Sequence, residues 1–264
     1  MGKFLNMEVH MHTNHFNSWY RSKWDRQMGQ SQPVGGAEMT SRKPHLVANS
    51  ILQREYPNTV VLRGSLNENK VALTFDDGPD IRFTPQVLNV LNKYKIKATF
   101  FLMGARAAEH SDIVRRMHAE GHVIGNHTYW HPNLTEGSLE RVHWEVTSTE
   151  EVLAQIIEYR PRLFRAPYGA LNREIVELMR QMGYSVILWN VDSLDWRQLG
   201  TTVISDIVLA NTEPGSIVLM HDGGDWTMDL SGTVHSLHDI IPRIQQEGIE
   251  FVTIPELLNI SKAK

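Results

Sequence analysis

The chain has 264 residues, of which 41% are hydrophobic and 21% charged, a composition typical of a soluble globular protein with a sizeable core. Its formal net charge of -4 is mild and argues against a nucleic-acid-binding surface. Cysteine is absent, which excludes disulfides and a cysteine nucleophile, so the 13 histidines and the carboxylates are the route to a tight metal site.

Residues 1–55 are predicted to form an N-terminal extension, partly irregular, ahead of a single domain over 56–264. Up to about residue 43 the extension is polar and shows no clear period. No apolar run in the chain is long enough to cross a bilayer, and no signal-peptide hydrophobic region is visible. The myristoylation pattern is not met, because Asn6 stands where Ser or Thr is needed.

A short helix is expected over 46–54 and a short strand over 59–62, and from residue 71 the pattern becomes regular. Strands are predicted over 71–75, 98–103, 123–125, 163–166, 185–191, 216–220 and 251–254. Helices are predicted between them over 84–95, 107–120, 139–158, 172–182, 202–211 and 234–247. Repeated strand–helix alternation indicates a parallel sheet, either a closed or nearly closed β/α barrel or an open doubly wound sheet. In both, function gathers at the carboxyl ends of the strands.

The strand over 71–75 ends in two adjacent carboxylates, Asp76 and Asp77, followed by Gly78-Pro79. Neighbouring carboxylates at the end of a buried strand are costly unless they are compensated. From this stretch alone, three explanations of the paired carboxylates remain open: a bound cation, a protonated carboxyl, or solvation of both in a turn. Polar residues also follow four other predicted strands, at Asn126–His131, Arg165–Gly169, Asp192–Trp196 and His221–Gly224.

His127 and His131 are four residues apart, a spacing that puts both imidazoles on one face of a helical turn. Alone, such a pair is more often solvated or capping. With Asp77 from a neighbouring strand end, two histidines and one carboxylate form a catalytic metal pattern with open positions. One divalent metal ion is therefore expected. Zinc is the first choice, and cobalt, iron or nickel would fit the same ligands.

Asp76 is better suited to be the base beside a metal-bound water, because consecutive strand side chains diverge. Arg165 could hold it ionised through a bidentate pair. The turn after Arg165 has backbone N–H groups that could serve an oxyanion. His221 ends a buried strand, and Asp195 could hold its ring in the orientation of a general acid. The aromatic residues near these motifs suit either sugar stacking or the core; they are Tyr129, Trp130, Trp196 and Trp226.

Five stretches carry a resemblance to a known family. They are T-F-D-D-G-P (74–79), H-T-Y-W-H (127–131), R-A-P-Y-G (165–169), D-S-L-D-W (192–196) and I-V-L-M-H-D (217–222). In this order they resemble the motifs of the polysaccharide deacetylases, carbohydrate esterase family 4, also called the NodB homology domain. The resemblance spans roughly residues 58–258. It implies a distorted (β/α)7 TIM-like barrel and metal-dependent removal of acetyl groups from N-acetylglucosamine-type units of peptidoglycan or chitin oligomers.

The resemblance also implies a role for each matching residue. Asp76 is similar to the catalytic base, Arg165 to the residue that orients it, and Asp195 to the partner of the acid His221. The metal ligands implied are Asp77, His127 and His131; the Tyr168 N–H resembles the oxyanion donor and Trp196 the wall of the acetyl pocket.

The partner expected is an acetylated glycan, without nucleic acid and without an integral membrane segment; no oligomeric state is predicted. Family members usually act outside the cytoplasm, whereas no export signal is visible in this sequence. Three rival hypotheses are a metal-dependent hydrolase of a non-sugar amide, a glycosidase with paired carboxylates, and a non-catalytic carbohydrate-binding protein. Metal dependence and acetate release distinguish them.

Overall fold

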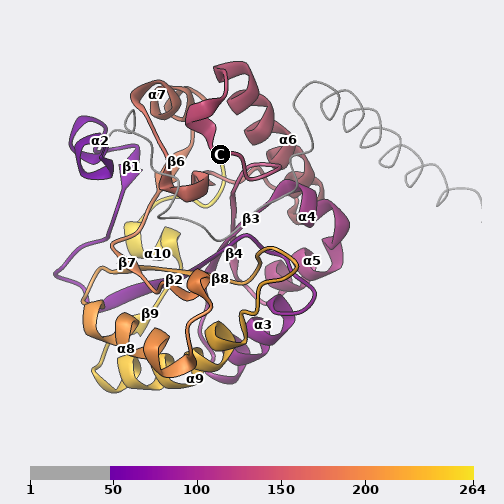
Figure 1. Cartoon of the computed structure of the whole chain (residues 1–264). Helices are drawn as coiled ribbons and strands as arrows, with labels where there is room; N and C mark the ends of the chain where they lie inside the picture. Colours follow the sequence, from indigo (N-terminus) through magenta and orange to yellow (C-terminus); the bar gives the residue numbers. More distant parts are fainter. Residues whose placement is uncertain (1–47) are drawn as a thin grey trace, which may run out of the picture. The chain divides into compact units, whose positions relative to one another are not determined.

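The structure is a computed structural model that describes residues 48–264, so most of the predicted extension lies outside the described residues. Its centre is a sheet in which all paired strands run parallel (Figure 1). The strands are β1 (Val60–Val61), β2 (Lys70–Asp76), β3 (Thr99–Leu102), β4 (Val123–Asn126), β5 (Leu163–Phe164), β6 (Ser185–Ile187), β7 (Val191–Asp192), β8 (Ile217–His221) and β9 (Glu250–Phe251).

The order of the strands identifies the sheet as a distorted barrel. It runs β1-β6-β5-β4-β3-β2-β8-β7, and β9 pairs with the start of β2. From β2 to β6 each strand is added on the same side of the one before, and β8 returns to the other side of β2. An open doubly wound sheet would reverse its strand order at a switch point, which this sheet does not do. The predicted barrel is therefore confirmed, and its ladder of paired strands is open between β1 and β7.

The prediction of one strand over 185–191 is wrong, because this stretch crosses the opening of the barrel. β6 pairs with β5 and β1, whereas β7 pairs with β8 on the other side. The Leu188 N–H donates to Val61 at 2.8 Å, and two residues later the Asn190 N–H donates to Ile217 at 3.3 Å. Residues 185–188 and Val191 are buried, whereas Trp189 is half-buried and Asn190 is exposed, so the polar Asn190 was the available signal for the change of pairing partner.

The helices connect the strands, much as predicted. They are α2 (Asn49–Glu55), α3 (Thr84–Lys93), α4 (Gly104–Glu109), α5 (Ser111–Ala119), α6 (Leu139–Ile157), α7 (Arg173–Gln181), α8 (Thr201–Asn211), α9 (Ser231–Gln246) and α10 (Ile254–Leu258). The expected helix over 107–120 is in fact two helices, α4 and α5, which meet at His110, a residue with φ -120° and ψ 49°. Gly121 follows α5 with φ 84°, the left-handed conformation expected at the end of a helix.

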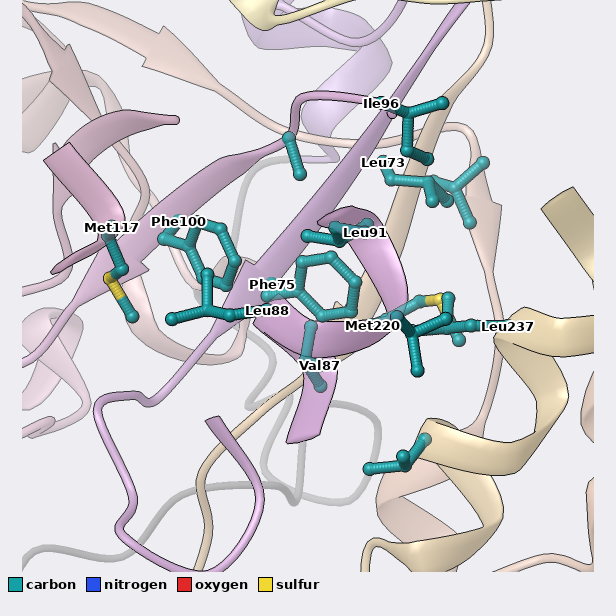
Figure 2. Close-up of a cluster of buried hydrophobic side chains, with 14 of the residues drawn as sticks. Leu73, Phe75, Val87, Leu88, Leu91, Ile96, Phe100, Met117, Met220 and Leu237 are labelled. Carbon is teal, nitrogen blue, oxygen red and sulfur yellow. The ribbon is translucent and has the colours of Figure 1, made fainter. Parts of the chain in front are cut away.

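The main hydrophobic core lies between the sheet and the helices (Figure 2). Phe75 of β2 and Phe100 of β3 stack with ring centroids 5.1 Å apart, and Leu88 of α3 and Leu237 of α9 belong to the same buried cluster. Burial of this kind stabilises a fold by about 25 cal/mol per Å² of apolar surface. The helices are thereby held against the barrel, and the strand ends keep fixed positions.

The amino-terminal end of the barrel is closed by packing. A second apolar cluster comes from the strands themselves, including Ala72, Phe101 and Ile187, together with Ile254 of α10. The Ile254 N–H donates to the hydroxyl of Thr99, the first residue of β3, at 3.0 Å. The polar residues that follow the strands therefore gather at the opposite, carboxyl end.

The proposed domain division at residue 55 stays a prediction. Helix α2, which ends there, has one buried residue, Leu52, in a cluster with Phe164 of β5 and Val186 of β6. The strand predicted over 59–62 is present as β1, which extends the sheet beside β6.

Candidate active site

Asp77 lies at the centre of the site. It follows β2 directly, and its φ of 70° is left-handed, so the strand's alternation of side chains stops at this residue. Its Oδ1 lies 3.1 Å from the His131 Nε2 and 3.4 Å from the His127 Nε2. Ligand atoms of these three buried residues all lie within 4.8 Å of one another. The structure thus brings together the three residues predicted to bind a metal.

The two histidines reach this position from a loop, so the predicted helical turn is wrong. His127 follows β4 directly, and both Thr128 (φ 66°) and His131 (φ 60°) are left-handed. The loop is held by its own polar groups: the His131 N–H donates to the Thr128 hydroxyl at 3.1 Å. The imidazole rings lie 4.9 Å apart at an angle of 59°. A spacing of four residues has the same effect here as on a helix, by a different backbone path.

The tautomer of His127 follows from its partner. Its Nδ1 lies 2.8 Å from the carbonyl oxygen of Arg165, which can only accept a hydrogen bond. Nδ1 therefore carries a proton, and Nε2 is directed toward Asp77. A metal-binding histidine commonly has its second nitrogen fixed in this way.

The donor set fits a divalent metal. Both carboxylate oxygens of Asp77 are buried, and neither has a hydrogen-bond partner among the described residues. Burial raises the pKa of this carboxyl, but the adjacent His131 and His127 lower it by more, so that the net pKa lies well below its ordinary value. A buried anion without hydrogen bonds is costly unless a cation compensates it. Two imidazole nitrogens and one carboxylate are ligands suited to zinc and related ions.

Asp76 is fixed by Arg165, as expected, although with a different geometry. The Nη1 of Arg165 donates to Asp76 Oδ1 at 2.7 Å and to the Thr74 hydroxyl at 2.8 Å. Its Nε and Nη2 donate to the carbonyl oxygens of Ile187 and Leu188. The contact with Asp76 thus uses one guanidinium nitrogen, so the predicted bidentate pair is wrong. The other carboxylate oxygen, Oδ2, lies 3.7 Å from the His127 Nε2 and faces the same centre.

His221 and Asp195 form a second fixed pair. The His221 Nδ1 lies 2.7 Å from Asp195 Oδ1, and the His221 backbone N–H donates to Asp195 Oδ2 at 2.8 Å. The Thr233 hydroxyl donates to the same Oδ2 at 2.8 Å. An ionised carboxylate can only accept, so His221 carries a proton on Nδ1 and its Nε2 is the reactive nitrogen. Thr233, at the start of α9, was not predicted from the sequence, because a lone Thr in a helix has no distinctive pattern.

Tyr168 and Trp196 lie beside residues of the site. Tyr168 has φ 60° in the turn Pro167–Gly169, and its ring packs edge-on against His131 with centroids 4.7 Å apart. Trp196 is half-buried beside Asp195 and packs against the main core. Their assigned roles as oxyanion donor and pocket wall stay predictions.

Two buried acids near the site, Glu145 and Asp222, were given no role from the sequence. Glu145 of α6 accepts the backbone N–H groups of Tyr129 and Trp130 at 2.9 and 2.8 Å, and so holds the loop between the two histidines. Its position among the apolar residues of α6 was the available signal. Asp222 accepts from the Thr84 hydroxyl at 2.6 Å, and burial is the main cause that raises its pKa to about 7.

Comparisons with known proteins agree with this geometry. The family model described as polysaccharide deacetylase matches residues 63–187. A peptidoglycan-N-acetylglucosamine deacetylase of Bacillus cereus is 40% identical over 203 residues, which are 76% of this chain and 72% of the relative. A chitooligosaccharide deacetylase of a Bradyrhizobium species is 38% identical over 71% of this chain and 90% of the relative. Some longer relatives are spanned over only 44% of their length.

A solved structure shows the same architecture. The crystal structure of the Bc1960 peptidoglycan N-acetylglucosamine deacetylase, in complex with an N-hydroxybenzamide compound, superposes with a TM-score of 0.74 at 40% identity. The match covers 77% of this chain and 94% of the solved one.

Proposed function

The chain belongs to the polysaccharide deacetylase family, carbohydrate esterase family 4, and from this premise we propose that it is a metal-dependent hydrolase. Its substrate would be an N-acetylglucosamine-type unit of a polysaccharide, and its products acetate and the free sugar amine. The observation that supports this most directly is the buried cluster of Asp77, His127 and His131 beside the Asp76–Arg165 pair.

Asp77, His127 and His131 would hold the metal, zinc being the first choice. A divalent ion bound there would supply Lewis-acid polarisation of the acetyl carbonyl and a lowered pKa for the attacking water. The remaining steps belong to the side chains of this chain.

Asp76 would act as the base. It takes a proton from the water as the oxygen attacks the acetyl carbon, and Arg165 keeps the carboxylate oriented. The backbone N–H of Tyr168 would donate to the oxyanion. His221, held by Asp195, then gives a proton to the sugar nitrogen as the C–N bond breaks. One water is consumed, and the acetyl group leaves as acetate.

The glycan is proposed from the relatives. The named relatives act on peptidoglycan or on chitooligosaccharides, and both substrates carry N-acetylglucosamine. Peptidoglycan would place the reaction outside the cytoplasm. None of the helices among residues 48–264 is long and apolar enough to cross a membrane.

An acetate-release assay tests the proposal. The protein is stripped with a chelator, zinc, cobalt, iron or nickel is added back singly, and peptidoglycan and chitin oligomers are compared. We expect release that requires metal and is restored best by zinc. Release of acetate without metal would refute the mechanism, and release only from a non-sugar amide would replace the substrate class. Hydrolysis of glycosidic bonds that is insensitive to chelator would identify a glycosidase.

A further inference from the structure

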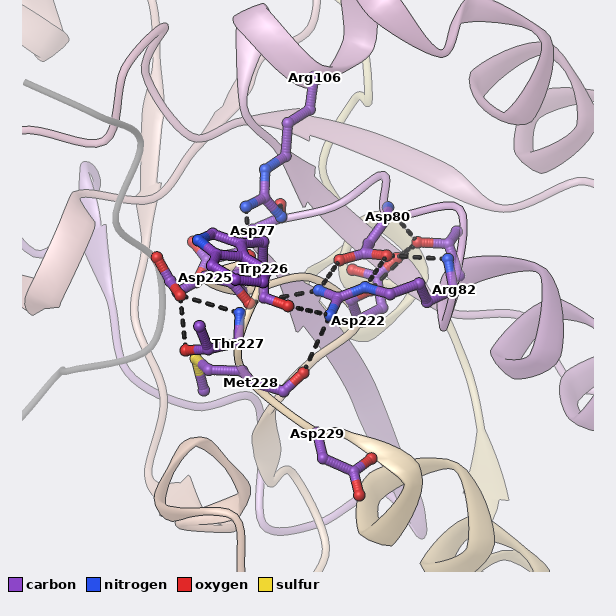
Figure 3. Close-up of polar contacts among 12 residues, drawn as sticks. Asp77, Asp80, Arg82, Arg106, Asp222, Asp225, Trp226, Thr227, Met228 and Asp229 are labelled. Carbon is purple, nitrogen blue, oxygen red and sulfur yellow. Dashed lines mark hydrogen bonds and ion pairs between the residues drawn. The ribbon is translucent and has the colours of Figure 1, made fainter.

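The loop that follows β8, residues 223–230, is held by two arginines from other elements (Figure 3). Arg82 donates through Nη1 to the carbonyl oxygens of Trp226, at 2.6 Å, and Met228, at 3.2 Å, and through Nη2 to that of Asp225, at 3.2 Å. Arg106, on α4, donates through Nη2 to the carbonyl oxygen of Gly224. The loop carries Trp226, whose side chain is among the most exposed apolar groups described, at 78%.

Arg106 has a second contact that Arg82 does not have. Its Nη1 donates to the backbone carbonyl oxygen of Asp77 at 2.9 Å. One guanidinium therefore joins the turn that presents the proposed metal ligand to the loop 223–230. Arg82 pairs instead with Asp80, through Nε at 3.0 Å and Nη2 at 2.7 Å. The two arginines hold the same loop but differ in whether they also hold the Asp77 turn.

The helix that carries Arg106 is itself fixed to the histidine loop. At its start, the Gly104 N–H donates to the carbonyl oxygen of Thr128 at 2.9 Å, and the Ala105 N–H donates to that of Tyr129 at 3.1 Å. Arg106 thus projects from an element bound to the loop between the two histidines and reaches the backbone of Asp77. The relative position of Asp77 and the two histidines depends on this short helix.

The fit around the guanidinium is tight. A Cβ at Gly223 would collide with the Asp77 carbonyl oxygen and with Arg106 Nη1. The left-handed backbone of Asp77, at φ 70°, is a conformation that costs a non-glycine residue free energy unless its surroundings hold it. The hydrogen bond from Arg106 to the Asp77 carbonyl is one of the contacts that do so.

We propose that Arg106 is a positioning residue that couples metal binding at Asp77 to the order of the loop 223–230. This inference rests on the proposed metal site. Metal binding fixes the Asp77 turn, the turn fixes the guanidinium, and the guanidinium fixes the Gly224 carbonyl. By linkage the effect is reciprocal, so an ordered loop also favours the metal-bound site. Trp226 would then take up its position at the rim together with a formed metal centre.

The test compares Arg106→Gln and Arg106→Lys with Arg82→Gln as the matched control. Zinc affinity is measured by competition with a chelator, and hydrogen exchange is followed by mass spectrometry in peptides spanning 74–78, which leave out Asp80 and its pairing with Arg82, and 223–230, with and without zinc. In the wild type, zinc slows exchange in both peptides. Arg106→Gln weakens zinc binding about tenfold, as loss of an outer-sphere contact does, and abolishes the zinc-dependent protection of 223–230. The zinc affinity of Arg106→Lys lies between those of the wild type and Arg106→Gln, because a single ammonium replaces a guanidinium that donates through two nitrogens.

Arg82→Gln speeds exchange in 223–230 but keeps the wild-type zinc affinity and the zinc-dependent protection. The inference is overturned if Arg106→Gln binds zinc as tightly as wild type, or if Arg82→Gln weakens binding equally. If the wild type itself bound no zinc, the proposed function would fail at its metal site. Hydrogen exchange without zinc would still test whether Arg106 links the Asp77 turn to the loop 223–230. Arg106→Gln must then speed exchange in both peptides, and Arg82→Gln only in 223–230. Thermal unfolding confirms that each variant is folded.

Discussion

Asp76 and His221 are register partners on the neighbouring parallel strands β2 and β8. Both are the last residues of their strands, and both are fully buried. Adjacent strands in a sheet lie about 4.8 Å apart, so the proposed base and the proposed acid reach the same end of the barrel side by side. Each has its own fixed partner, Arg165 for Asp76 and Asp195 for His221. These different partners are the basis for proposing separate roles for Asp76 and His221, although both lie at the same end of the barrel.

The first prediction concerns the base. Asp76→Asn should keep the metal and lower kcat by about 100- to 10,000-fold, because the amide keeps the shape of the carboxyl but does not take a proton from water. Metal content by atomic emission and acetate release on the same sample check it. An active variant, or one that has lost its metal, would contradict the division of roles between Asp76 and Asp77.

The second prediction concerns the ligand. Asp77→Asn should weaken metal binding first, by more than about 100-fold given that outer-sphere changes alone reach 100-fold. The cause is loss of the anionic donor, since Asp77 Oδ1 lies 3.1 Å from the His131 Nε2 and 3.4 Å from the His127 Nε2. Chelator competition measures affinity, and Asp76→Asn is the matched control on the adjacent residue. If the two variants held metal equally well, Asp77 would not be a ligand.

The third prediction concerns the acid. Asp195→Asn should lower kcat by up to about 10,000-fold, as in other histidine–carboxylate pairs, because the amide no longer fixes the Nδ1 proton of His221. Thr233→Val should have a smaller effect, since it removes one donor to Asp195 Oδ2 and leaves the contact with His221. Steady-state kinetics with metal content held equal gives the order of the two effects. The reverse order would show that Asp195 does not act through His221.

The fourth prediction concerns stability and pH. Burial is the main cause that lowers the pKa of His122 to about 4, below its ordinary 6.5. The unfolded chain therefore binds a proton at a higher pH than the folded one, so the stability gained from neutral His122 is complete above pH 6.5 and is lost as pH falls toward 4. The loss amounts to about 3 kcal/mol.

His122→Asn isolates this effect. The His122 Nδ1 accepts the Ala98 N–H at 3.1 Å, and an Asn side-chain oxygen can replace it without titrating. Denaturant unfolding of metal-free protein at pH 7, 5.5 and 4 should show a shallower loss of stability in the variant. Equal pH dependence in both proteins would place the titration elsewhere.

The sequence by itself determined the alternation of strands and helices and the set of residues at the strand ends, and the resemblance of its five motifs to a known family implied the barrel. These depend on local periodicity and on the order of short motifs, which a linear chain displays directly. The sequence predicted that Asp77, His127 and His131 lie close together, because the carboxyl ends of parallel strands all lie on one side of the sheet.

Only the tertiary structure decided how those residues meet. The change of partner within 185–191 depends on which strand lies across the opening, and the single exposed Asn190 does not identify that strand. The left-handed Asp77 is held in part by Arg106, and the non-helical histidine loop in part by Glu145, so local propensity alone does not show them. Arg106 lies 29 residues from Asp77 and 118 from Gly224, and Glu145 lies 16 from Tyr129. Such contacts form when the chain packs, so the sequence shows the ligands and the fold decides what holds them.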